Sequence, residues 1–187
     1  SISIPNSVTS IGENVFAYCE NLKTATLSNK IKTISFSAFS GCYSLTGIEI
    51  PNSVTTIDEE AFSYCESITN ITIGENVNSI GKCAFMSCNG LSRISTLNPT
   101  PPTCGENVFK NVNVSNVTLT VPTGSVSKYK SADTWKDFKY EQTDEDPSEP
   151  ELPTDNSGLS YNILNSTEVE VIAGAEKYTG DIVIPSQ

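Results

Sequence analysis

Histidine is absent from all 187 residues of this chain, and methionine and tryptophan occur once each. Without histidine the chain cannot assemble a Ser-His-Asp or Cys-His catalytic arrangement, and it lacks the commonest general base. Glycine-rich phosphate loops are also missing, and no apolar run is long enough to cross a bilayer. The sequence therefore predicts no enzymatic activity, no cofactor and no direct membrane insertion.

Positive charge is scarce, with 11 basic residues against 22 acidic ones and a net charge of −11. Such a balance disfavours a nucleic-acid partner, because phosphates bind to clustered lysine and arginine. No signal peptide precedes the first apolar residues, so we expect an export signal to lie upstream in a longer protein.

A fixed period of 23 residues organises the first half of the chain. Repeats of this length are typical of solenoids, in which each unit buries its apolar face only by stacking on copies of itself. Phenylalanine recurs at Phe16, Phe39, Phe62 and Phe85, and cysteine recurs at Cys19, Cys42, Cys65 and Cys88. Aliphatic positions recur at the same spacing: Val8, Ile31, Val54 and Val77; Ile11, Ile34, Ile57 and Ile80; Leu22, Leu45, Ile68 and Leu91; Ala25, Ile48, Ile71 and Ile94.

Each repeat predicts one short strand followed by turns. Leu22, Ala25 and Leu27 are spaced to point inward while the residues between them are polar, a pattern typical of one strand of a curved parallel sheet with its other face in solvent. The segment 13–19 is too short for a long helix. It predicts a single helical or 3₁₀ turn that places Phe16 in the core.

These repeats resemble the BspA-like leucine-rich repeats of bacterial cell-surface proteins. The pattern Ile-Pro-x-Ser-Val-x-x-Ile-x-x-x-Ala-Phe-x-x-Cys-x-x-Leu is clearest at residues 50–68, with Ile68 for Leu, and covers roughly residues 1–97. Val15 and Lys30 depart from it without disturbing an apolar position. The resemblance implies a right-handed α/β solenoid of leucine-rich repeats, β-rich with short helical turns, that is exported to the bacterial cell surface for adhesion or other protein contacts.

The chain beyond Leu97 divides into three further parts. Residues 98–140 predict a degenerate last repeat and a C-terminal cap, in which a helical pattern contains Tyr129 and Trp135 and Ser125 is the expected N-cap. Residues 141–157 contain seven acidic residues, three prolines and no basic residue, which predicts an extended linker. The linker lacks the alternating acids and turn glycine of a calcium loop. Residues 158–187 predict three short strands at 158–163, 168–172 and 181–186 that resemble the start of a second repeat array.

The six cysteines raise the question of disulfides. Residues at one repeat position should lie about 5 Å apart in adjacent repeats, but their side chains should run parallel, which opposes a disulfide dihedral. A row of buried thiols that donate weakly to neighbouring carbonyls is therefore expected, with Cys104 in a core position and Cys83 exposed. A stacked row also cannot surround a tetrahedral zinc ion.

The candidate binding surface is the outward face of the predicted sheet, which should bind a protein or glycan. Alternatives are a spacer between domains of a surface protein, a carboxylate site at Asp58-Glu59-Glu60, and self-association through a repeat edge or residues 158–187. Exposure of Tyr18, Tyr43 and Tyr64 together would favour binding over a spacer. The outward positions of the sheet face are Lys23, Thr24, Thr26, Thr46, Gly47, Glu49, Thr69, Asn70, Thr72, Ser92, Arg93 and Ser95.

Overall fold

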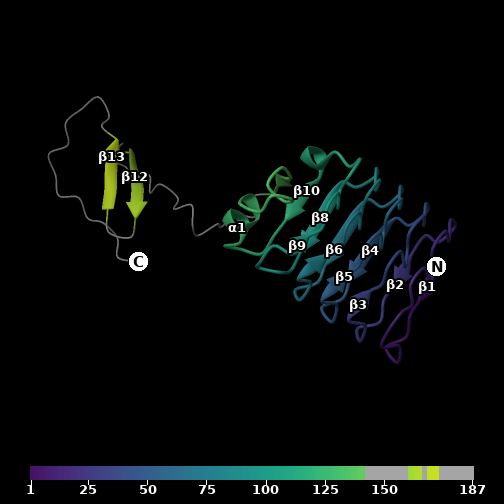
Figure 1. Ribbon diagram of the computed structural model, residues 1–187. Helices are drawn as coiled ribbons and strands as arrows, with labels where there is room; N and C mark the ends of the chain where they lie inside the picture. The colour runs from purple at the N-terminus through teal and green to yellow at the C-terminus, as the bar shows by residue number, and fades with distance from the viewer. Residues whose placement is uncertain (142–159, 166–167, 173–187) are drawn as a thin grey trace. The chain divides into compact units, whose positions relative to one another are not determined.

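The computed structural model describes residues 1–141, 160–165 and 168–172, and the chain divides into two compact units, Ser1–Asp146 and Pro147–Gln187. The first unit is a stack of similar turns in which short parallel strands run side by side (Figure 1). We call one turn of this stack a rung. The unit is a parallel β-solenoid of about six rungs with few helices.

The principal sheet has five parallel strands, β4 (Gly47–Ile50), β6 (Asn70–Ile73), β8 (Arg93–Thr96), β10 (Thr118–Thr120) and β11 (Lys139–Tyr140). Its register pairs Ile48 with Ile71 and Ile71 with Ile94, so equivalent positions of successive rungs lie directly beside one another. On the N-terminal side, β1 (Ile2–Ser3) pairs with β2 (Ala25–Thr26). Ile48, Ile71 and Ile94 are buried beneath this sheet, as the alternation predicted.

A second parallel sheet was not predicted. It consists of four two-residue strands, β3 (Thr33–Ile34), β5 (Thr56–Ile57), β7 (Ser79–Ile80) and β9 (Thr103–Cys104). Ile34, Ile57 and Ile80 are buried in it, so they were correctly placed in the core although their strands were missed. The expectation of one strand per repeat is therefore wrong: in the central rungs each repeat contributes two strands, and the core lies between the two sheets.

The segment 13–19 was expected to form a single helical or 3₁₀ turn, and it consists of linked turns whose local hydrogen bonds span three residues, as in a 3₁₀ turn, without a helix. Asn14 and Tyr18 have positive φ angles of 55° and 57°, which interrupt a helix after a single hydrogen-bonded turn. The amide of Ala17 donates to the carbonyl of Asn14, but the amide of Phe16 donates across to Ala38 of the next rung. The alternation of local and cross-rung bonds satisfies the backbone and still turns Phe16 toward the core, where it is half-buried.

A continuous stack of phenylalanine rings runs through the core beside these turns. Neighbouring ring centroids are 5.1–5.6 Å apart, and the planes of Phe39, Phe62 and Phe85 are within 5° of parallel. Phe39, Phe62 and Phe85 are fully buried. The stack continues into Phe109, which confirms that residues after Leu97 form one more rung in spite of the shifted spacing.

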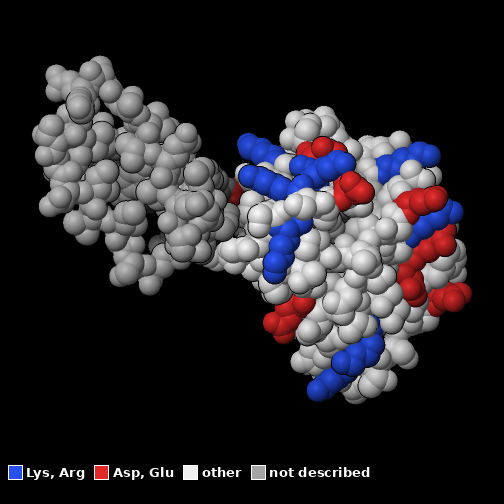
Figure 2. Space-filling model, turned by 60° about the vertical axis from the view of Figure 1, so that its left-hand side comes forward, with Lys and Arg blue, Asp and Glu red and all other residues white. Residues whose placement is uncertain are grey.

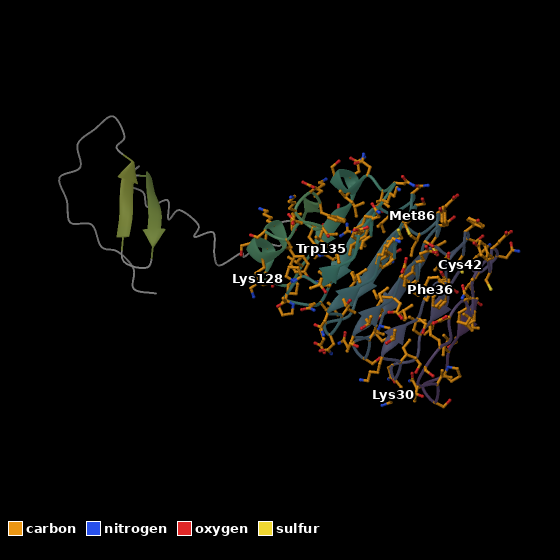
Figure 3. All side chains as sticks on the ribbon, in the orientation of Figure 1. Lys30, Phe36, Cys42, Met86, Lys128 and Trp135 are labelled. Atoms are coloured by element: carbon orange, nitrogen blue, oxygen red, sulfur yellow. The ribbon has the colours of Figure 1, made fainter. Side chains whose placement is uncertain are left out.

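The last rung is closed by a cap that begins with α1 (Val126–Lys130) and ends with β11, after the short 3₁₀ helix η1 (Val114–Asn116). Trp135 is buried edge-on against the Phe109 ring at 5.7 Å, and its indole N–H donates to the carbonyl of Pro102. The predicted anchoring role of Trp135 against the last rung is thus confirmed (Figure 3). The helix is shorter than the pattern indicated. Ser125 is its N-cap residue, as predicted, but the Ser125 side chain makes no cap hydrogen bond.

In the second unit the described residues form an antiparallel pair, β12 (Ser160–Asn165) and β13 (Glu168–Ile172). Two of the three strands expected in this segment are therefore present. The third, at 181–186, lies outside the described residues, as does the linker from residue 142 onward.

Candidate functional site

The outward side chains of the principal sheet form rows that run across the rungs. One row contains Gly47, Asn70, Arg93 and Thr118, and the next contains Glu49, Thr72, Ser95 and Thr120. Because the strands are parallel and in register, each row is a line of equivalent positions. Most of the predicted face is exposed, whereas Gly47, Thr72 and Ser95 are half-buried.

Three hydroxyls of this face are engaged in the fold itself. Thr46, Thr69 and Ser92 each donate to a backbone carbonyl of the preceding rung, Lys23, Thr46 and Thr69 respectively, over 3.0–3.2 Å. These bonds repeat from rung to rung, so we call them the hydroxyl ladder. A side chain already hydrogen-bonded within the fold offers less to a ligand, and Asn70 also accepts from the Thr69 hydroxyl at 3.2 Å. The more available polar groups of the first three rungs are therefore Lys23, Thr24, Thr26 and Glu49.

An ion pair occupies the C-terminal part of the same face. Arg93 donates to the Glu141 carboxylate at 2.7 Å, and the Thr120 hydroxyl donates to the same oxygen at 2.9 Å. Together the hydroxyl and the guanidinium hold the pKa of Glu141 below its usual value. Its amide also donates to Leu119, so Glu141, which the sequence placed in the acidic linker, extends the sheet of the last rung.

Three members of the cysteine row, Cys42, Cys65 and Cys88, lie inside the solenoid, whereas Cys19 in the first rung is exposed, so the expectation of a buried thiol is wrong there. The thiols of Cys42, Cys65 and Cys88 donate to the carbonyls of Phe16, Phe39 and Phe62 over 3.2–3.3 Å, which confirms the predicted weak donation. Burial raises the pKa of Cys42 to about 11 and that of Cys88 to about 12. These thiols are therefore protonated at neutral pH and unsuited to act as nucleophiles.

The expected exposure of Cys83 is wrong. Its side chain is only 7% exposed, although the same position is exposed at Asn14 and Asn107. Cys104, expected in the core, is half-buried and packs against the core cluster. Burial raises its pKa to about 11.

The carboxylates Asp58, Glu59 and Glu60 lie half-buried on the turn before Phe62. Glu59 forms an ion pair with Lys82 at 3.4 Å, which raises the pKa of that lysine. Burial, with a contribution from the nearby Glu13 carboxylate, raises the pKa of Asp58. Within the described residues, no group of three or more Cys, Asp or Glu is arranged to hold a metal ion.

The three tyrosines singled out from the sequence lie at the surface of the turns. Tyr18 is 67% exposed and Tyr64 is 42% exposed, while Tyr43 is half-buried. The two glutamates in line with Tyr43, Glu20 and Glu66, were not considered in the sequence analysis. Their signal was present in the same periodic spacing, because Glu20, Tyr43 and Glu66 occupy one repeat position.

The surface as a whole presents few concentrated charges. On the face shown in Figure 2, acidic and basic side chains lie next to one another in small groups, and uncharged areas separate these groups. Among the helices that the structure describes, none has the length and apolar character needed to cross a membrane.

Solved structures that are similar to this chain include three bacterial leucine-rich proteins. A leucine rich cell surface protein of Faecalibacterium prausnitzii is 37% identical over 50% of this chain, with a TM-score of 0.49. A leucine-rich repeat protein of Bacteroides ovatus is 25% identical over 67% of the chain, with a TM-score of 0.43. The leucine rich repeat protein of T. pallidum is 26% identical over 74% of this chain and 71% of its own length, with a TM-score of 0.49.

This chain spans only 25% of the Faecalibacterium protein and 43% of the Bacteroides protein. A search of curated proteins gave no match.

Comparison with family models gives a match along most of the solenoid. The BspA type leucine rich repeat region matches residues 1–115 and 55–132, and its model contains six copies of the repeat. The matched residues include the phenylalanine stack, the cysteine row and the sheet face described above. The chain belongs to the BspA-type leucine-rich repeat family.

Proposed function

We propose that this chain is a non-enzymatic interaction module of a bacterial cell-surface protein and that it adheres to a protein or glycan through its principal sheet face. The observation that carries the proposal is the set of aligned outward rows on β4, β6 and β8, which places equivalent polar side chains at regular intervals over several rungs. A surface of this kind gains affinity by adding weak contacts together.

Family membership supports the extracellular part of the proposal, since the BspA-like resemblance implies export. The scarcity of basic residues agrees with a partner other than nucleic acid.

A spacer between domains is the second candidate function. It is favoured by the acidic, proline-containing segment 141–157 and by the hydroxyl ladder, which uses Thr46, Thr69 and Ser92 for the fold rather than for a ligand. Exposure of Tyr18 and Tyr64 weighs toward binding, because exposed aromatic side chains are costly to keep in water and are enriched at contact sites.

The test uses the full chain on arrays of purified extracellular matrix proteins and purified glycans. The blocking variant is Thr72→Arg, which places a long side chain at the centre of the sheet face. The matched control is Ser79→Arg, at a half-buried position on the second sheet. Binding that Thr72→Arg abolishes and Ser79→Arg retains supports the sheet face. Equal binding by both variants contradicts it, and no binding to any protein or glycan favours the spacer.

A further inference from the structure

Two neighbouring rows of turn residues are aligned across the first three rungs. One row is Tyr18, Gly41 and Tyr64, and the other is Glu20, Tyr43 and Glu66; we call the five side chains the Tyr–Glu array. The backbone keeps both rows in line. The amides of Tyr18, Gly41 and Tyr64 donate to the next rung over 2.7–2.8 Å, and Ser44 and Ser67 donate back to Glu20 and Tyr43 over 3.1–3.2 Å.

Gly41 makes the arrangement of the array possible. A Cβ atom at this position would lie 2.7 Å from Cδ1 and 3.0 Å from Cε1 of Tyr18, so the Tyr18 ring rests against the bare backbone of the next rung. Gly41 also has a φ angle of 68°, which favours glycine further. The opposite surface of the Tyr18 ring stays open to solvent, since 67% of the residue is exposed.

The charges around the array have one sign. In the turns 13–21, 36–44 and 58–67 every charged residue is acidic: Glu13, Glu20, Asp58, Glu59, Glu60 and Glu66. Lys82 of the following rung is paired with Glu59. Glu20 and Glu66 are exposed, and neither lies within ion-pair distance of a lysine or arginine among residues 1–141.

The array is confined to three rungs. At the position of Tyr64 the next two rungs have Ser87 and Asn111, and at the position of Glu66 they have Asn89 and Asn113. The turn edge therefore changes from aromatic and acidic to neutral and polar along the solenoid, although the backbone repeats. An aromatic and acidic composition is thus a local property of the first three rungs and not a requirement of the fold.

We propose that the Tyr–Glu array binds a basic peptide segment of a partner protein, with arginine or lysine side chains over the tyrosine rings and against the two glutamates. This inference rests on the proposed interaction function but assigns a second surface, on the turn edge rather than on the sheet. Guanidinium groups stack on aromatic rings and pair with carboxylates, and an exposed apolar group rimmed by one sign of charge selects partners of the opposite sign.

The distance between Glu20 and Glu66 in the array sets the distance expected between the two basic side chains of the partner peptide. Glu20 and Glu66 are two rungs apart, a separation of about 10 Å when strands lie about 4.8 Å apart. Basic side chains three positions apart in a polyproline II segment lie on the same face and are separated by about 9 Å, close to this distance. The preferred ligand therefore has the form Arg-x-x-Arg, with the two arginines on Glu20 and Glu66 and the intervening backbone over Tyr43.

The test titrates the full, isotopically labelled chain with the blocked peptide Gly-Arg-Ser-Ser-Arg-Gly and follows amide NMR signals. A matched peptide replaces both arginines with glutamine. We expect concentration-dependent shifts at Tyr18, Gly41 and Tyr64 with the arginine peptide only. We expect the variant Tyr18→Ser/Tyr64→Ser to weaken binding at least about fivefold, since two cation–π contacts are lost, and Tyr18→Phe to retain it.

A charge-matched pair of variants separates the array from general electrostatic attraction. Glu20→Gln/Glu66→Gln removes two charges from the array, and Glu75→Gln/Glu106→Gln removes two exposed charges elsewhere. Binding lost only in the first variant supports the proposal. It is overturned by equal losses in both variants, by unchanged binding in Tyr18→Ser/Tyr64→Ser, or by equal shifts with the glutamine peptide. The sheet-face variant Thr72→Arg should bind the peptide normally, so failure of the array and failure of the sheet-face proposal remain distinguishable.

Discussion

Replacing Phe62 with alanine should cost more stability than the same change at any terminal member of the phenylalanine stack. The Phe62 ring is fully buried and lies 5.3 Å from Phe39 and 5.4 Å from Phe85, nearly parallel to both. Truncation therefore removes apolar burial, leaves a cavity in a rung with neighbours on both sides, and breaks two ring contacts. We expect a loss of about 3–5 kcal/mol in the free energy of unfolding, of which the two ring contacts account for about 1–3 kcal/mol.

Phe16→Ala is the matched control within the same chain. Phe16 is half-buried and has one stacked neighbour, Phe39 at 5.1 Å, so its truncation should cost less than half as much. Both variants are measured by urea unfolding followed by far-ultraviolet circular dichroism and tryptophan fluorescence. A loss below about 1 kcal/mol for Phe62→Ala, or equal losses for the two variants, would refute the conclusion that the continuous stack is a main source of stability.

Two further predictions concern the thiols and the glycine at the turn. Burial raises the pKa of Cys42 to about 11 and of Cys88 to about 12 from 9.0, so the folded chain keeps protons that the unfolded chain releases. The contribution of these thiols to the free energy of unfolding is complete below pH 9 and falls as the pH rises toward their folded-state pKa values, by about 1.4 kcal/mol per thiol at pH 10. Urea unfolding at pH 8 and pH 10 should show this fall, and the variant Cys42→Ala/Cys88→Ala should show a smaller one. Gly81→Ala should destabilise by about 1–3 kcal/mol or more, because its Cβ would lie 2.4 Å from the Glu59 amide nitrogen. Gly12→Ala, at the same repeat position with no atom within 4 Å, should leave the melting temperature nearly unchanged.

The core could be predicted from the sequence because its residues recur at fixed intervals. Phe39, Ile48 and Cys65 are all buried at the positions their spacing indicated. The second sheet was missed because strands of two residues, such as Thr33–Ile34, are too short to show an alternation. These short strands are defined by hydrogen bonds to the neighbouring rung, and such bonds leave no local pattern in the sequence.

The positive φ angles within the turns could not be predicted for a related reason. Asn14, Ser37, Glu60 and Cys83 all have positive φ angles, yet they share no residue type that marks this conformation. What they share is a cross-rung hydrogen bond from the backbone amide to the next rung, which no local sequence pattern indicates.

Exposure of the sheet face followed from alternation, and its role in binding stays a prediction. The sequence could not predict which hydroxyl groups of this face are available to a ligand. The hydroxyl ladder of Thr46, Thr69 and Ser92 depends on the distance between a side chain and the carbonyl of the preceding rung. Only the tyrosines of the Tyr–Glu array were predicted from the sequence; Glu20 and Glu66 were not, although they recur at the same spacing.

The edge-on contact between Trp135 and Phe109 limits where further repeats can be added to the solenoid. Four phenylalanine pairs stack face to face, but Trp135 and Phe138 meet the last ring at 70° and 77°. A ring added beyond them would find no parallel surface to stack on, whereas a ring inserted between Phe62 and Phe85 would. Duplication of a repeat is therefore compatible with any position before the cap and incompatible with a position after it. Internal duplication can vary the number of rungs while the cap stays the same.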